Sequence, residues 1–218
     1  MNYFAHGRHW LDDPYFLAGT AVPDWLSVSD RGVRVRARAA LAWVDDADAR
    51  LASLARGIVQ HHRDDAWFHE TAAFAELQWR FAAMIRESME PDDSLRPSFL
   101  GHVLVEVLLD AALIAENPAQ LDAYYAAVEQ LDAATVHALV NRLAPRPCDR
   151  LAWFVEAFSR ERFLFDYADD AKLWWRMNQV MRRVRLPELG KGFLTMLPAA
   201  RELVTRNRAQ LLTPTASQ

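Results

Sequence analysis

The sequence predicts an all-α protein, and three observations on its 218 residues support that fold class. Only 7 glycines are present, whereas a β-sandwich or β-barrel needs many tight turns. Apolar residues recur at helical spacing along most of the chain, and helix-start signals precede several of these stretches. The length fits one compact multi-helix domain, which we expect to span residues 1–212, followed by a flexible tail at 213–218.

The predicted helices follow from this periodicity and from the residues that bound it. An Asx side chain caps free backbone amides, and a proline directly after it starts a helix without losing a hydrogen bond, as at Asp13-Pro14 and Asn117-Pro118. Asp132 is a third start signal. The predicted helices span roughly 14–21, 36–63, 66–90, 98–116, 118–131, 133–143, 149–165, 170–185 and 195–211.

Proline-containing stretches separate the predicted helices at 91–93, 145–147 and 187–192, and none is long enough to be an interdomain linker. Residues 31–36 alternate like a β-strand, but six residues do not make a sheet. We expect the arginines of this segment to form a solvated edge. The aromatic residues of the C-terminal half have helical spacing, which favours a core role first and a ligand pocket second.

Composition excludes several classes of protein. A hydrophobic fraction of 52% rules out wholesale disorder, and the glycine motifs of dinucleotide and P-loop sites do not occur. The single cysteine, Cys148, excludes an internal disulfide and a Cys-based zinc site. A net charge of −4 argues against a nucleic-acid partner.

We expect a cytoplasmic protein without a membrane span. The longest apolar stretch, residues 103–115, is interrupted by Glu106 and Asp110, so it falls short of the roughly 18–20 uncharged apolar residues that a span needs. The N-terminal residues lack the basic start and the cleavage site of a signal peptide.

The segment from Leu100 to Glu116 carries a polar stripe on an otherwise apolar helix. His102, Glu106 and Asp110 occur at positions i, i+4 and i+8 and therefore share one face. A helix this apolar should be buried, and buried carboxylates without partners are costly. We expect a metal ion, arginines from other helices or hydrogen-bond partners to offset the cost of burying these carboxylates.

A second stripe has the same spacing. If one helix continues through Asp64, then His61, Asp65 and His69 point the same way. Two such stripes facing each other would supply four to six nitrogen and oxygen ligands, a set that suits Mn, Fe or Zn.

A structural explanation competes with this metal site. A single histidine is more often packed or at the surface than a ligand, and the stripe on residues 102–110 could be a buried hydrogen-bonded network with Arg partners. His62 and Asp64 lie off the stripe, so we expect them to be solvated. The two stripes taken together favour the metal site.

Several motifs resemble those of the bacterial acyl carrier protein phosphodiesterases, an all-helical family distantly related to the His-Asp metal-dependent phosphohydrolases. The resemblance covers about the first 115 residues. It rests on the start Met-Asn-Tyr-Phe-Ala-His6, on residues 19–26 with Pro23-Asp24, on Gly57-Ile-x-x-His61-x-x-x-Asp65-Ala-Trp and on Glu106-x-x-x-Asp110.

The resemblance implies a His-Asp phosphohydrolase-like fold with a manganese-type metal centre, and it adds His6 and Asp24 to the site. His61 and Asp65 match the family's central His and Asp, and the Glu106 and Asp110 pair matches its paired acids, with Glu in place of Asp. The ligand set departs from the family at two positions. Ala111 stands where the family has His, and His69 stands where it has Asp.

These observations predict a metal-dependent phosphoesterase that acts on a phosphorylated small molecule or on acyl carrier protein, and they leave the oligomeric state open. A metal-bound hydroxide would attack phosphorus in line; we assign catalytic roles to Asp65, Glu106 and Arg63, the arginine steadying the phosphate oxygens. The alternative is a non-catalytic helical protein with a buried polar network or a ligand-binding pocket. The predicted metal ligands are His6, Asp24, His61, Asp65, His69, His102, Glu106 and Asp110.

Overall fold

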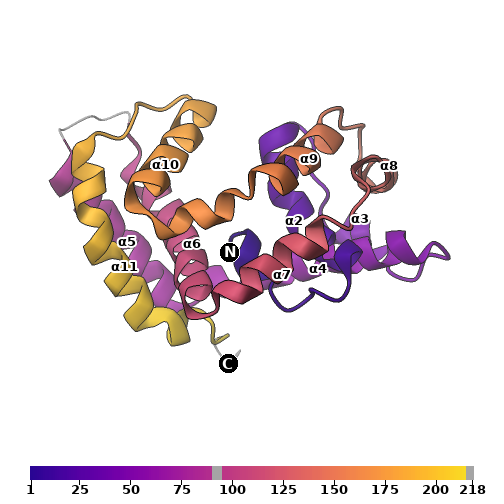
Figure 1. The fold of residues 1–218 in the computed structure, drawn as a ribbon, viewed down its shortest axis with the longest axis horizontal. Helices are drawn as coiled ribbons and strands as arrows, with labels where there is room; N and C mark the ends of the chain where they lie inside the picture. The colour runs from indigo at the N-terminus through magenta and orange to yellow at the C-terminus, as the bar shows by residue number, and fades with distance from the viewer. Residues whose placement is uncertain (90–94, 215–218) are drawn as a thin grey trace. The chain divides into compact units, whose positions relative to one another are not determined.

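The computed structural model describes residues 1–89 and 95–214, and every regular element within them is helical (Figure 1). The predicted all-α class is therefore confirmed. The breaker at 91–93 and residues 215–218 of the predicted tail lie outside the described residues.

The chain divides into two compact units, which are described separately. The first unit comprises residues 2–66 and 117–163, and the second comprises Met1, 67–116 and the chain from 164 onward. The helix Ala49–His69 contributes most of its length to the first unit and its last three residues to the second.

The helices of the first unit begin largely where the sequence predicts. Asp13 caps α2 by accepting from the Phe16 amide at 3.0 Å, and Asp132 caps α8 in the same way. Asn117 occupies the cap position of α7, but its side chain makes no capping hydrogen bond. The helices of this unit are α1 (Tyr3–Gly7), α2 (Pro14–Ser29), α3 (Ala37–Leu41), α4 (Ala49–His69), α7 (Pro118–Val128), α8 (Ala133–Leu143) and α9 (Leu151–Glu161).

Two glycines allow α2 and α4 to pack with their backbones in contact. A Cβ on Gly57 would lie 2.1 Å from the Phe16 carbonyl oxygen and 2.8 Å from the Gly19 Cα. A Cβ on Gly19 would lie 2.2 Å from the Leu54 carbonyl oxygen. No side chain fits at either position, so the crossing depends on both glycines.

The second unit is built around α6 (Pro97–Glu116), which α5 (Ala72–Ser88) and α11 (Lys191–Leu211) contact. Gly101 fits against the backbone of α5, because a Cβ there would lie 2.5 Å from the Gln78 carbonyl oxygen. The remaining elements of this unit are α10 (Asp170–Val184) and, from residue 164 onward, the 3-10 helix η1 (Phe163–Ala168).

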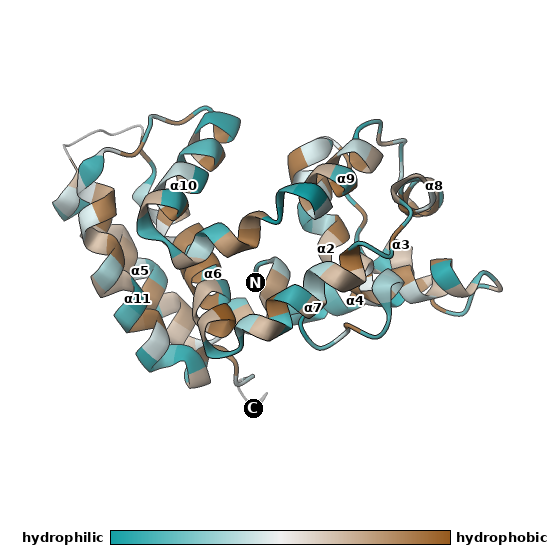
Figure 2. Ribbon diagram, viewed as in Figure 1, coloured by the Kyte–Doolittle hydropathy of each residue, from teal (hydrophilic) through white to brown (hydrophobic). Residues whose placement is uncertain are grey.

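Helix α6 is as apolar and as buried as its sequence predicts, and its ribbon is largely brown in Figure 2. It is also the one described helix that is long and apolar enough to cross a membrane. However, 61% of its most apolar window is buried inside the protein. Buried core helices of soluble proteins pass the same test, so this match is weak evidence for a membrane span.

The structure differs from the predicted boundaries in several places. Helix α1 was not predicted, because five residues are too few to show periodicity. The predicted helix at 36–63 is divided into α3 and α4, and the predicted interruption near 64 does not occur. Helix α2 continues through Pro23 to Ser29. Residues 31–36 form no strand, and in this segment the two valines are buried whereas the arginines are exposed, as expected.

Candidate metal centres

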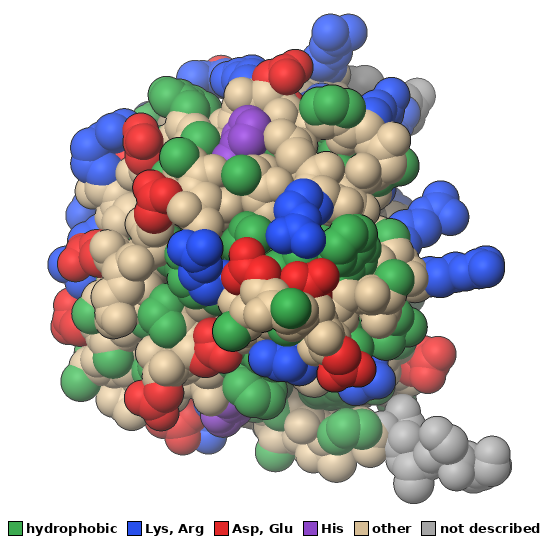
Figure 3. Space-filling view, turned by 90° about the vertical axis from the view of Figure 1, so that its right-hand side faces the viewer, with side chains coloured by type: hydrophobic (Ala, Val, Ile, Leu, Met, Phe, Trp, Pro, Cys, Tyr) green, Lys and Arg blue, Asp and Glu red, His purple; other side chains and the backbone are tan. Residues whose placement is uncertain are grey.

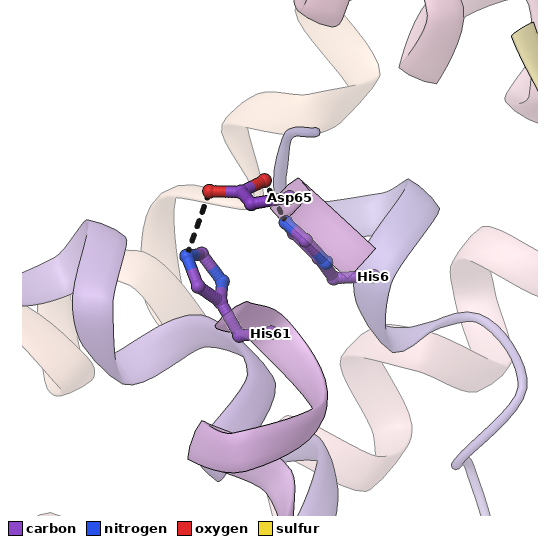
Figure 4. A group of neighbouring side chains, drawn as sticks. All are labelled: His6, His61 and Asp65. Carbon is purple, nitrogen blue, oxygen red and sulfur yellow. Dashed lines mark ion pairs between the residues drawn. The ribbon is translucent and has the colours of Figure 1, made fainter. Parts of the chain in front are cut away.

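The first candidate centre lies in the first unit and consists of His6 from α1 with His61 and Asp65 from α4 (Figure 4). One ligand atom from each residue lies within 4.8 Å of the others. The histidine side chains are 0% and 4% exposed, whereas that of Asp65 is 30% exposed. The group is therefore anchored in the core and reaches solvent at its carboxylate.

The packing of α2 against α4 fixes the orientation of His61. Its Nδ1 lies 2.8 Å from the carbonyl oxygen of Thr20, the residue after the close-packed Gly19. A carbonyl oxygen only accepts, so Nδ1 carries the proton. The other ring nitrogen, Nε2, faces Asp65 with 3.4 Å between Nε2 and Oδ2.

Asp64 orients His6 in the same manner. The Nδ1 of His6 donates to Asp64 Oδ2 at 3.3 Å, and Gln60 donates to the other Asp64 oxygen at 2.8 Å. The His6 Nε2 atom then lies 3.2 Å from Asp65 Oδ1. Metal-binding histidines almost always have such a partner on the second ring nitrogen.

This finding corrects two expectations about residues that lie off the stripe. Asp64 is a half-buried partner of His6 rather than a solvated side chain. The Nε2 of His62 donates to the Val35 carbonyl oxygen at 2.9 Å, and this side chain is also half-buried. Asp64 contacts α1 through His6, and His62 contacts the segment before α3 through Val35. The helical period of α4 alone does not show that these segments cover the two side chains.

The charges of the first centre stabilise one another. Burial alone would raise the pKa of Asp65, but hydrogen bonds from His6 and His61 outweigh it and hold that pKa well below its usual range. Burial alone would lower the pKa of His61, whereas the hydrogen bond to Asp65 and the negative charge of Asp24 raise it. Asp65 is thus held in its ionised form, and Asp24 contributes further negative charge near His61.

The spacing of the donor atoms fits a small divalent ion. Metal–ligand bonds of about 2.0–2.2 Å put neighbouring ligand atoms about 3.3–3.6 Å apart around a tetrahedral ion and about 2.8–3.1 Å apart around an octahedral ion. The His6 Nε2 lies 3.2 Å from one carboxylate oxygen of Asp65, and the His61 Nε2 lies 3.4 Å from the other. Two imidazoles and one carboxylate also leave coordination positions open for water or substrate.

The second candidate centre lies in the second unit and consists of His69, His102 and Glu106. The Nε2 atoms of the two histidines lie 2.9 and 3.3 Å from Glu106 Oε1. The N-terminal ammonium of Met1 lies 3.2 Å from the same oxygen. Burial alone would raise the pKa of Glu106, but the ammonium and the two histidines hold it below its usual range.

The predicted ligands fall into two groups, one within each unit. Helix α4 continues through Asp64, as the second stripe requires, but His69 joins the centre of the second unit. Asp110 is fully buried and belongs to neither group. Arg63 is exposed and lies two positions from both His61 and Asp65, which places it on the opposite side of α4.

Sequence reasoning missed the residues that orient the ligands. The Thr20 carbonyl is a backbone group, and no side-chain pattern shows that it will meet His61. Gln60 and Asp64 have the i, i+4 spacing of a hydrogen-bonded helical pair, and this signal was available in the sequence.

The surface gives no sign of segregated charge on the face drawn in Figure 3, where acidic and basic side chains are intermixed. Comparisons with protein-family models, with curated proteins and with solved structures find no match to this chain. The chemistry of the two centres is therefore argued from their own geometry.

Proposed function

We propose that this protein is a divalent-metal-dependent phosphoesterase whose ion is held by His6, His61 and Asp65. One observation carries the proposal. Both imidazoles donate from Nδ1 to an oxygen acceptor, so both direct Nε2 toward the same ionised carboxylate at spacings that suit a metal ion.

A bound divalent ion at such a centre supplies a water of lowered pKa and polarises a phosphoryl oxygen. The residues of the chain would hold the ion and orient its ligands. Thr20 and Asp64 fix the two imidazole rings, and the charge of Asp24 favours a cation beside His61. The partly exposed Asp65 lies at the side of the group that solvent and substrate reach.

The choice of phosphoester hydrolysis rests on the resemblance to the acyl carrier protein phosphodiesterases. His6, Asp24, His61, Asp65, Glu106 and Asp110 are the positions that match that family's motifs, and three of them, His6, His61 and Asp65, make up the first centre. The proposal therefore includes a His-Asp phosphohydrolase-like fold, a cytoplasmic location and a phosphodiester or phosphomonoester substrate, either a small molecule or phosphopantetheine on acyl carrier protein.

A non-catalytic role is the second candidate, and the contacts of the first centre favour it specifically. The imidazoles already form ion pairs with Asp65, and the Nδ1 atom of each has an oxygen acceptor, so the group can persist as a buried polar network. The two candidates differ in whether a metal binds and whether hydrolysis depends on it.

The deciding experiment measures metal content and hydrolysis together. Protein purified without chelator is analysed for transition metals, then stripped and titrated with Mn²⁺, Fe²⁺ or Zn²⁺, with bis(p-nitrophenyl) phosphate and p-nitrophenyl phosphate as substrates. We expect metal-dependent hydrolysis of at least one of them, and a loss of more than about 100-fold in H61A and D65N. D122N, which changes an exposed carboxylate of the same unit, is the matched control.

Two results would contradict the proposal. Less than about a tenth of an equivalent of transition metal, with no binding on titration, would favour the polar network. Metal binding without hydrolysis, or hydrolysis that H61A and D65N retain, would show that the first centre is not a phosphoesterase site.

A further inference from the structure

The His69, His102 and Glu106 group is not used by the proposed function, yet its donors are arranged as closely as those of the first centre. From this geometry we propose that the three residues form a second, independent metal site that takes Zn²⁺ or a similar borderline divalent cation.

The donor atoms of this group converge on one point. The Nε2 atoms of His69 and His102 both approach Glu106 Oε1, at 2.9 and 3.3 Å, distances that match ligand–ligand spacings around one small ion. His102 and Glu106 are one turn apart on α6, and His69 comes from the last residue of α4. Two helices therefore present three ligands, the number that a zinc site with an open position uses.

The surroundings hold the two imidazoles in place. Phe74 of α5 contacts both rings edge-on, with centroids 4.7 Å from His69 and 4.9 Å from His102. The residue before His102, Gly101, lies directly against the α5 backbone. The position of His102 relative to Phe74 is therefore fixed by the α5–α6 crossing, which makes this a preorganised group.

Exposure allows an ion to enter. The side chains of His69, His102 and Glu106 are 31%, 37% and 17% exposed, so water can reach the group and occupy the remaining coordination position. Two imidazoles select a borderline cation over Ca²⁺ or Mg²⁺, which prefer oxygen ligands.

The test is a titration of the metal-stripped full chain with Co²⁺, followed by its visible absorption, and with Zn²⁺, followed by competition with a chromophoric chelator. We expect about two equivalents bound by the wild type and about one by H102A and by E106Q. E76Q, an exposed glutamate variant on α5, should bind like the wild type. H102A should keep the phosphoesterase activity, because His102 is not part of the first centre.

Stoichiometry in the variants separates this proposal from the proposed function. A single equivalent that H61A removes and H102A leaves would overturn the second site alone. A single equivalent that H102A removes and H61A leaves would support the second site and contradict the first. E106Q also removes the ion pairs of the metal-free group, so nitrogen-15 NMR of the histidine rings supplies a measurement that needs no variant. Zn²⁺ must shift the Nε2 signals of both His69 and His102, and unchanged signals would overturn the site.

Discussion

At the residue scale, the hydrogen bond on the far side of each imidazole decides whether the first centre can bind a metal. His61 uses a backbone carbonyl and His6 uses the Asp64 carboxylate. An acceptor at Nδ1 fixes the ring plane, and in the neutral ring that binds a metal it directs the lone pair of Nε2 into the group. Asp64 acts here as a positioning residue.

Replacing Asp64 tests this role. In D64A the His6 ring loses its acceptor, and we expect the metal affinity of the first centre to fall by about 10- to 100-fold. D64N keeps an oxygen acceptor without its charge, so its metal affinity should fall less than that of D64A. The affinities are measured by competition with a chelator, with D45A, an exposed aspartate variant, as control. Wild-type affinity in D64A would show that the ring needs no such partner.

Cys148 provides a second prediction at this scale. Burial raises the pKa of its thiol to about 11, and the thiol donates to Asn141 Oδ1 at 3.1 Å. Thiolate is the reactive form, so the native protein should resist iodoacetamide at pH 7.5 and react fully in denaturant. Mass spectrometry counts the modified fraction, and rapid native alkylation would contradict the buried position.

What the sequence predicts at this scale is limited to side chains on one helix. The i, i+4 spacing predicts correctly that His61 and Asp65 share a face, as do His102 and Glu106. It does not show that Asp110, one turn further along the same face, lies outside both groups. That outcome depends on which neighbouring helix covers each turn of α6, which is a tertiary property.

At the element scale, the glycine contact between α2 and α4 links the fold to the first centre. In G57A the new Cβ would lie 2.1 Å from a backbone oxygen of α2, so the helices must separate. Overpacking of this kind costs about 1–3 kcal/mol, against about 1 kcal/mol gained in helix propensity. Separation also moves the Thr20 carbonyl away from His61.

We therefore expect G57A to unfold at lower urea concentration and to bind the metal of the first centre more weakly. The two losses are measured by urea titration of the stripped protein and by chelator competition. G190A is the control, because a Cβ there would meet only the Met89 side chain, at 3.8 Å. An unchanged metal affinity in a folded G57A would break the proposed link between the crossing and the ligand.

Asp30 connects two elements of the first unit and gives a pH-dependent prediction. It follows α2, and its carboxylate accepts the amides of Asp149 and Arg150 at the start of α9. Burial opposes its ionised form, but these hydrogen bonds and one from Ser29 outweigh it and lower the pKa of Asp30. A lowered folded-state pKa contributes stability above the unfolded pKa of about 3.9, and that contribution is lost as the pH falls through the folded value.

The expected result for D30A is a lower free energy of unfolding at pH 7, by about 1–2 kcal/mol. The difference from the wild type should shrink as the pH falls below about 4. Urea titrations at pH 7, 5 and 3 measure it. A difference that stays constant over this range would show that the charge of Asp30 plays no part.

Capping chemistry explains why helix starts were predicted better than helix interiors. Asp13 and Asp132 cap α2 and α8 as expected, because a cap is a local interaction between residues three apart. The predicted helices leave out residues 64–65 of a polar run, an interruption that α4 does not have. The packing of α4 against neighbouring helices overrides the weak local preference of such a run.

At the scale of the whole molecule, composition predicts the fold class correctly. It does not predict which of the candidate metal ligands belong to the same centre. Few glycines and a helical period favour helices over sheets, and both are properties of the chain as a whole. The assignment of His69 to one centre and of His61 and Asp65 to another depends on where the two units divide helix α4. No periodic pattern marks that boundary, since the helix runs through it without a break.

A metal that binds only the folded chain must raise its stability by mass action, and this gives the last prediction. At a free metal concentration 100 times the dissociation constant, one site adds about 2.7 kcal/mol to the free energy of unfolding. We expect thermal unfolding of the wild type to shift upward with added Zn²⁺ or Mn²⁺ and to return on addition of EDTA. D65N should lose the part of the shift due to the first centre and E106Q the part due to the second, while the double variant should show none. A metal-induced shift of wild-type size in the double variant would place the bound ions elsewhere in the protein and contradict both centres at once.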